Sequence, residues 1–120
     1  MTELAKKRPE FSNINALYFA YHDGTNYQDV IFGSSNYRDN TWRHFAISRQ
    51  NGVLRAFVDG VQVGTNQTVT QSFYSSNRIV VGAELASPTY FTGYIDDLRI
   101  TRAARYTANF TPPTQAFPNQ

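Results

Sequence analysis

Two tight-turn dipeptides constrain the fold of this chain more than any other feature of its sequence. Asn51-Gly52 and Asp59-Gly60 both lie in the stretch 42–64, and segments rich in β-branched and aromatic residues flank each of them. Both dipeptides favour type I′ turns, because asparagine, aspartate and glycine tolerate the positive φ that such a turn needs at its two central residues. The stretch therefore predicts three antiparallel strands, with the strand at 53–58 in the centre.

The rest of the chain predicts more strands. Aromatic residues make up 15% of the sequence, and they recur with β-branched residues in short segments that polar loops separate, a composition typical of all-β proteins. The short stretch 101–106 has local helical character. The C-terminal end contains prolines, which cannot donate to a strand ladder, so we expect it to lie extended and to be anchored by Phe110 and Phe117. The further predicted strands are at 14–21, 27–32, 78–82 and 93–100.

The alternation of side chains is irregular in the last of these strands. Tyr94, Leu98 and Ile100 have one parity, and Ile95 breaks it. An extra residue in the strand would turn Ile95, Leu98 and Ile100 to the same side. We therefore predict a β-bulge near Asp96-Asp97, with those three apolar side chains facing inward.

Length and charge limit the classes of protein that this chain resembles. A chain of 120 residues without cysteine predicts one domain that is held by its core rather than by disulfides. The net charge is only +2, and the cations outside Lys6, Lys7 and Arg8 are dispersed, which argues against a nucleic-acid partner. No apolar run is long enough for membrane insertion, and the leader lacks the apolar region of a signal peptide. We expect a polar, basic arm at 1–13, either disordered or docked on a neighbouring subunit, and a domain at 14–120.

Several motifs, in order along the chain, resemble one known family. Trp42, His44 and Ala46, followed by Arg49 and then by Asp59-Gly60, resemble the W-x-H-x-A…R…FVDG core of laminin G-like domains. These domains belong to the concanavalin A-like lectin/glucanase jelly rolls. Gly82 and the stretch 93–100 are similar to the late strands of that family. The ending at 104–113 is similar to the version found in bacteriophage tail and other virion proteins, and the whole resemblance covers about residues 15–118.

The resemblance implies an antiparallel β-sandwich of the jelly-roll kind in a non-enzymatic virion module of a tail or fibre. Such a module assembles with other subunits and recognises host-surface glycan. The matching part is the later portion of the jelly roll, so the sandwich is expected to be truncated at its N-terminal strands. Because unpaired edges and an exposed apolar face are usually covered, we predict a homo-oligomer or docking onto other virion subunits. The alternatives are a purely structural virion or capsid-decoration protein without a ligand, and a bacterial adhesion module.

Catalysis, metal binding and cofactors are not expected. Glucanase relatives need two closely spaced carboxylates, whereas the glutamates here are Glu3, Glu10 and Glu84, and no Glu-x-Asp-x-x-Glu pattern is present. The resemblance makes a rim calcium at Asp96 and Asp97 an alternative. The structural interpretation, in which these carboxylates accept local N–H groups or pair with nearby arginines, is favoured over metal binding.

Sugar recognition requires exposed aromatic faces beside amide, carboxylate or hydroxyl groups. Two loops have this composition, one at 21–27 and one at 34–40. Trp42 could serve as a sugar platform, but its position in the W-x-H-x-A pattern predicts core packing instead, and His44 is predicted to be a satisfied strand residue. The candidate ligand-binding residues are therefore Tyr21, His22, Asp23, Asn26, Tyr27, Tyr37 and Tyr90.

Overall fold

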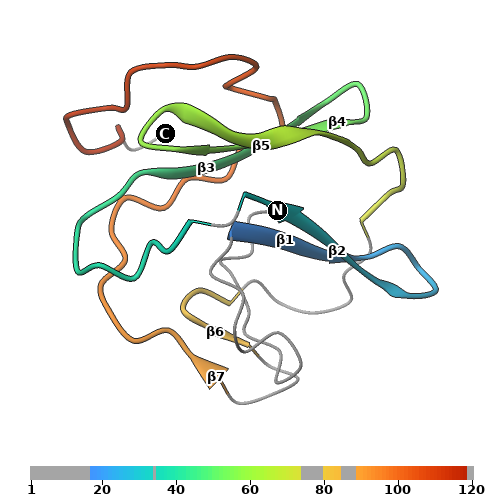
Figure 1. The fold of residues 1–120 in the computed structure, drawn as a ribbon, viewed down its shortest axis with the longest axis horizontal. Helices are drawn as coiled ribbons and strands as arrows, with labels where there is room; N and C mark the ends of the chain where they lie inside the picture. Colours follow the sequence, from blue (N-terminus) through green and yellow to red (C-terminus); the bar gives the residue numbers. More distant parts are fainter. Residues whose placement is uncertain (1–16, 34, 74–79, 85–88, 119–120) are drawn as a thin grey trace.

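The computed structural model describes residues 17–33, 35–73, 80–84 and 89–118, and this part of the chain is entirely β-strand and irregular backbone (Figure 1). The predicted all-β class with antiparallel strands is therefore confirmed. The predicted arm at 1–13 lies outside the described residues. The strands are β1 (Leu17–His22), β2 (Tyr27–Phe32), β3 (Phe45–Gln50), β4 (Val53–Val58), β5 (Val61–Thr68), β6 (Ala83–Glu84) and β7 (Thr89–Tyr90).

The predicted three-stranded meander is present, with β4 between β3 and β5. Asn51 and Gly52 have φ values of 50° and 74°, and Asp59 and Gly60 have 51° and 79°. Positive φ at both central residues is the property that favours Asn-Gly and Asp-Gly in two-residue hairpins. The turns therefore set the antiparallel register of the sheet, in which Phe45 is opposite Val58.

The β1–β2 hairpin packs on one face of this meander (Figure 1). The core takes Phe19 and Phe32 from the hairpin and Leu54, Ala56 and Val58 from β4. The three β4 residues alternate along the strand, so they share one face. Two antiparallel layers that bury their facing side chains form a β-sandwich, consistent with the fold class that the sequence predicts.

The opposite face of the meander is covered by the C-terminal segment. Phe57 lies on that face, and its ring centroid is 6.3 Å from that of Tyr106 and 5.5 Å from that of Phe110. The Phe110 N–H donates to the carbonyl oxygen of Gly60 (2.9 Å), and the N–H of Gln62 donates to Asn109 Oδ1 (2.9 Å). The predicted anchoring of this end by Phe110 is confirmed, and the backbone of the end is irregular, with bends.

The second predicted anchor, Phe117, also makes a contact: the guanidinium carbon of Arg99 lies 3.8 Å from its ring centroid. The helical character predicted for 101–106 is wrong, because the backbone there is irregular. One helical turn is too short to be stable alone, and the docking of Tyr106 on the sheet sets the local backbone instead.

The predicted bulged strand at 93–100 is also wrong. No strand forms over 91–100, Asp97 has a φ of 50°, and Ile95, Leu98 and Ile100 are all exposed rather than inward. A strand requires a hydrogen-bonded neighbour, and no described strand pairs with this segment. A register shift does occur in the described sheet, but it lies between β4 and β5, beside Leu54 and Ala56.

The strand predicted at 78–82 differs as well. Its first two positions lie outside the described residues. Residues 80–82 are not in a strand, and a two-residue strand, β6, begins at Ala83 instead and pairs with β7. Strand β7, the partner of β6, is also only two residues long. Residues 80–82 therefore lack a described strand with which to pair, whatever their local β-propensity.

Candidate functional site

The polar side chains at the tip of the β1–β2 hairpin build the turn. Asp23 Oδ1 accepts the N–H groups of Thr25 and Asn26, both at 2.8 Å, and its Oδ2 accepts Gln28 Nε2 at 3.0 Å. These hydrogen bonds hold the pKa of the Asp23 carboxyl below its usual value, and the bond from the backbone N–H of Asn26 has the largest effect. His22 Nδ1 accepts the backbone N–H two residues further along the chain at 3.0 Å. The predicted ligand groups His22 and Asp23 therefore serve as acceptors within the turn.

The predicted tyrosines lie in different environments. Tyr21 is in the core, with its ring centroid 4.9 Å from that of Phe73. Tyr37 is half-buried and packs edge-on against Phe45 at 5.8 Å. Tyr27, which begins β2, and Tyr90, in β7, are 61% and 76% exposed. The two exposed rings are carried by separate hairpins (Figure 1).

A different pair of aromatic residues comes together on the surface. Trp42 is 69% exposed and Tyr94 is 86% exposed, and their ring centroids are 6.5 Å apart with an interplanar angle of 37°. The prediction that Trp42 packs in the core is wrong. Strand β3 begins only at Phe45. Trp42 therefore lies before the strand in which the sequence pattern placed it. We refer to Trp42 and Tyr94 as the aromatic pair.

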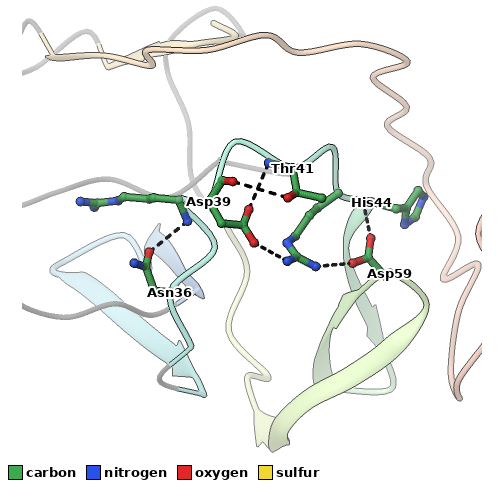
Figure 2. A network of polar contacts seen from close by, with 7 residues as sticks. Asn36, Asp39, Thr41, His44 and Asp59 are labelled. Carbon is green, nitrogen blue, oxygen red and sulfur yellow. Dashed lines mark hydrogen bonds and ion pairs between the residues drawn. The ribbon is translucent and has the colours of Figure 1, made fainter.

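Residues that precede and follow Trp42 in the sequence take part in a network of ion pairs and hydrogen bonds (Figure 2). Arg43 bridges two carboxylates, since its Nη1 lies 2.9 Å from Asp59 Oδ2 and its Nη2 bonds Asp39 Oδ2. The N–H of His44 donates to Asp59 Oδ1 at 2.9 Å, and the N–H of Thr41 donates to Asp39 Oδ1 at 3.1 Å. We call these contacts the Arg43 clamp.

The clamp fixes the backbone on both sides of Trp42. The residue before it is bonded to Asp39, and the second residue after it is bonded to Asp59, at the turn between β4 and β5. The hydrogen bond from Arg43 lowers the pKa of the Asp39 carboxyl, so this carboxylate stays charged over most of the pH range. Because the loop is held in one conformation, the indole loses little conformational entropy when a ligand binds.

His44 connects the clamp to the C-terminal segment. Its ring is half-buried and lies edge-on to Tyr106 and Phe110, with centroids 6.3 and 5.5 Å apart. Burial lowers the pKa of the imidazole, and the Asp59 carboxylate opposes that shift. The prediction that His44 is a satisfied strand residue is wrong, because His44 precedes β3 and its ring Nδ1 has no hydrogen-bond partner, although its backbone N–H donates to Asp59.

The two adjacent aspartates considered for calcium are both exposed, and Asp96 Oδ1 accepts the N–H of Asp97 at 2.9 Å. Across the described ranges, no group of three or more histidine, aspartate or glutamate side chains is placed to hold a metal ion. Within the same ranges, no helix is long and apolar enough to cross a membrane.

Comparison with known proteins identifies the family of the chain. A family model described as the concanavalin A-like lectin/glucanases superfamily matches residues 9–109. No curated protein and no solved structure matches the chain. The family match spans most of the sequence and includes the meander, the Arg43 clamp and the aromatic pair. The antiparallel all-β structure agrees with it, and the chain therefore belongs to the concanavalin A-like lectin/glucanase superfamily.

Proposed function

We propose that this chain is a non-enzymatic recognition module that binds carbohydrate through the aromatic pair. The observation that carries the proposal is the exposure of Trp42 and Tyr94 at a ring separation of 6.5 Å. Aromatic rings that face solvent offer flat apolar surfaces to the C–H faces of a sugar ring. Membership of a superfamily that includes lectins supports carbohydrate as the ligand class.

Polar groups beside the aromatic pair supply the hydrogen bonds that a sugar needs. Asn40 and Thr41 precede the indole and are exposed, and Asp96 follows Tyr94 by two residues and is exposed as well. Amide, hydroxyl and carboxylate groups near an aromatic face can orient sugar hydroxyls. Asp39 and Asp59, in contrast, are engaged by Arg43, which supports a binding role rather than a hydrolytic one.

The biological setting that we propose is a bacteriophage virion, in which the module belongs to a tail or fibre and recognises host-surface glycan. This setting is supported by the similarity of the ending at 104–113 to virion proteins of the family. The module also assembles with other virion subunits or with copies of itself, without nucleic acid, cofactor or membrane insertion.

A glycan array probed with the full chain tests the carbohydrate proposal. We expect Trp42→Ala and Tyr94→Ala to lose at least about tenfold in affinity for any glycan that the unmodified chain binds, since each removes a stacking surface. Tyr27→Ala and Tyr90→Ala are the matched controls, because both remove exposed aromatic rings elsewhere. Unchanged binding by Trp42→Ala, or a loss confined to the two control variants, would refute the role of the aromatic pair.

A second candidate function is a purely structural virion protein without a ligand. It is favoured by the exposed apolar side chains at 80–81 and 91–100, which are typical of a surface that meets another protein. A chain that binds nothing on the array but assembles into particles would support this alternative.

A further inference from the structure

We infer that two copies of this chain associate through the apolar surface formed by residues 80–81 and 91–100. The inference rests on the assembly role within the proposed function and is independent of carbohydrate binding. The surface, called the apolar patch below, consists of exposed large side chains from two segments of the described chain: Val80, Val81, Phe91, Ile95, Leu98 and Ile100.

The two segments of the apolar patch lie against each other. The N–H of Phe91 donates to the carbonyl oxygen of Gly82 at 2.8 Å. The side chain of Ile95 lies beside Gly82, since a Cβ placed there would be in ordinary van der Waals contact with Ile95 Cδ1, at 3.7 Å. Phe91 and Ile95 therefore lie beside the segment that carries Val80 and Val81, and Leu98 and Ile100 follow them along the same segment. Apolar surfaces that gather exposed side chains in this way usually mark protein contacts.

The backbone of this surface is also available to a partner. Residues 93–100 include Tyr94, Ile95 and Ile100, which are residue types that favour strands, and no described strand pairs with them. Unpaired N–H and C=O groups beside apolar side chains form a template for strand addition from another chain.

Charge complementarity identifies the partner as a second copy. In a two-fold antiparallel pairing centred on Leu98, Leu98 faces its own equivalent, and Asp97 of each copy faces Arg99 of the other. The Asp97 carboxylate is exposed and makes no ion pair within the described chain. Centring the pairing on Arg99 would instead place two guanidinium groups opposite each other. The charges therefore select the register at Leu98.

Pairing in this register requires a local change of conformation. The φ of 50° at Asp97 interrupts the extended backbone of the free segment, so Asp97 must move into the β region, which residues with a side chain favour, when the pair forms. The contact with the Phe117 ring restrains the Arg99 guanidinium beside the segment. The pairing spans 95–101 and leaves Tyr94 outside it. The aromatic pair of each copy therefore stays accessible in the dimer.

Sedimentation velocity of the full chain over a range of concentrations tests the association. We expect a reversible dimer, and we expect Leu98→Glu to shift it to monomer, with at least a tenfold weaker association. The matched control is Ile31→Glu on β2, since Ile31 is 47% exposed and Leu98 is 46% exposed. A wild-type chain that stays monomeric and binds only other proteins of a particle would overturn the proposal, and so would a dimer that Leu98→Glu leaves intact.

Charge exchange tests the register. Asp97→Arg alone and Arg99→Asp alone should each weaken self-association, because each places like charges opposite each other. Mixing the two variants should restore a dimer, because every facing pair then joins Arg to Asp. Failure of the mixture to recover would overturn the Leu98 register. Trp42→Ala should weaken glycan binding at least about tenfold and leave the dimer intact, which separates this test from that of the carbohydrate proposal.

Discussion

At the scale of single residues, two similar turn glycines have different surroundings. Gly52 and Gly60 both have positive φ in tight hairpins. A Cβ at Gly60 would lie 1.9 Å from the backbone oxygen of Phe110, whereas the closest atom to one at Gly52 is a methyl group of Thr70, at 2.8 Å. The sequence predicts both turns from their dipeptides. It does not predict the approach of the C-terminal backbone to Gly60, because that contact joins distant parts of the chain.

Gly60→Ala should destabilise the protein by at least about 2 kcal/mol, because it combines an unfavourable φ with a backbone clash. Gly33→Ala is the control, since Gly33 has a φ of 63° and a Cβ added there would have no heavy atom within 4 Å beyond its chain neighbours. It should cost about 1 kcal/mol from φ alone. Urea unfolding measures both values, and equal costs would contradict the close approach at Gly60.

Trp42 is the single tryptophan of the chain, so its fluorescence reports on the Arg43 clamp directly. Arg43→Ala removes the group that bridges Asp39 and Asp59, and the loop that carries the indole should move more freely. We expect lower steady-state anisotropy of Trp42 and weaker glycan binding. Arg38→Ala, which removes a nearby exposed cation, should change neither quantity. Unaltered anisotropy in Arg43→Ala would show that the clamp does not hold the indole.

At the scale of elements, local patterns predict the meander but not the later strands. Strands β3 and β4 and the start of β5 follow from turn chemistry and short-range alternation, which act between neighbours in sequence. The continuation of β5 to Thr68 lies beyond the stretch 42–64 from which the meander is predicted. The segment 93–100 also contains residues that favour strands, among them Ile95 and Ile100, but a strand also needs a partner, and propensity carries no information about one. The residues of the candidate site also divide into those that local sequence predicts and those that depend on tertiary structure. His22 and Asp23 are identifiable as polar loop residues, whereas the aromatic pair depends on a tertiary contact between Trp42 and Tyr94.

The C-terminal segment should contribute measurably to stability as an element. Tyr106 and Phe110 stack with centroids 3.5 Å apart and cover Phe57. Because both rings are half-buried, Phe110→Ala should cost about 1–3 kcal/mol, below the range for a fully buried aromatic ring. Tyr94→Ala, at an exposed ring, should cost less than about 0.5 kcal/mol. Thermal and urea unfolding measure both, and equal losses would contradict the packing role of Phe110.

At the scale of the whole molecule, composition and motif order predict the fold class and the family correctly. Aromatic and β-branched enrichment with few helix signals leads to an antiparallel sandwich, and the family match over residues 9–109 agrees. The exposure of Trp42, Ile95 and Leu98 could not be predicted, because it depends on contacts that exist only in the folded chain.

The pH dependence of global stability should carry the signature of His44. Burial places its folded pKa below the ordinary 6.5, so the unfolded chain binds a proton more readily. The contribution of His44 to the free energy of unfolding is fully present above pH 6.5, and it is lost as the pH falls from 6.5 toward the lower pKa of the folded state. Urea unfolding on both sides of pH 6.5 measures this, and His44→Gln should flatten the profile in that window. Asp23 and Asp39, whose pKa values are lowered from 3.8, act only at more acidic pH.

The late position of Tyr106 and Phe110 has a consequence for biosynthesis. All three strands of the meander are complete by Thr68, but Tyr106 and Phe110, which pack on Phe57 at the outer face, come much later in the chain. A nascent chain can therefore pair β3, β4 and β5 while still on the ribosome and expose an apolar sheet face until those residues emerge. Ribosome stalling between these two points would leave the growing chain in its most aggregation-prone form.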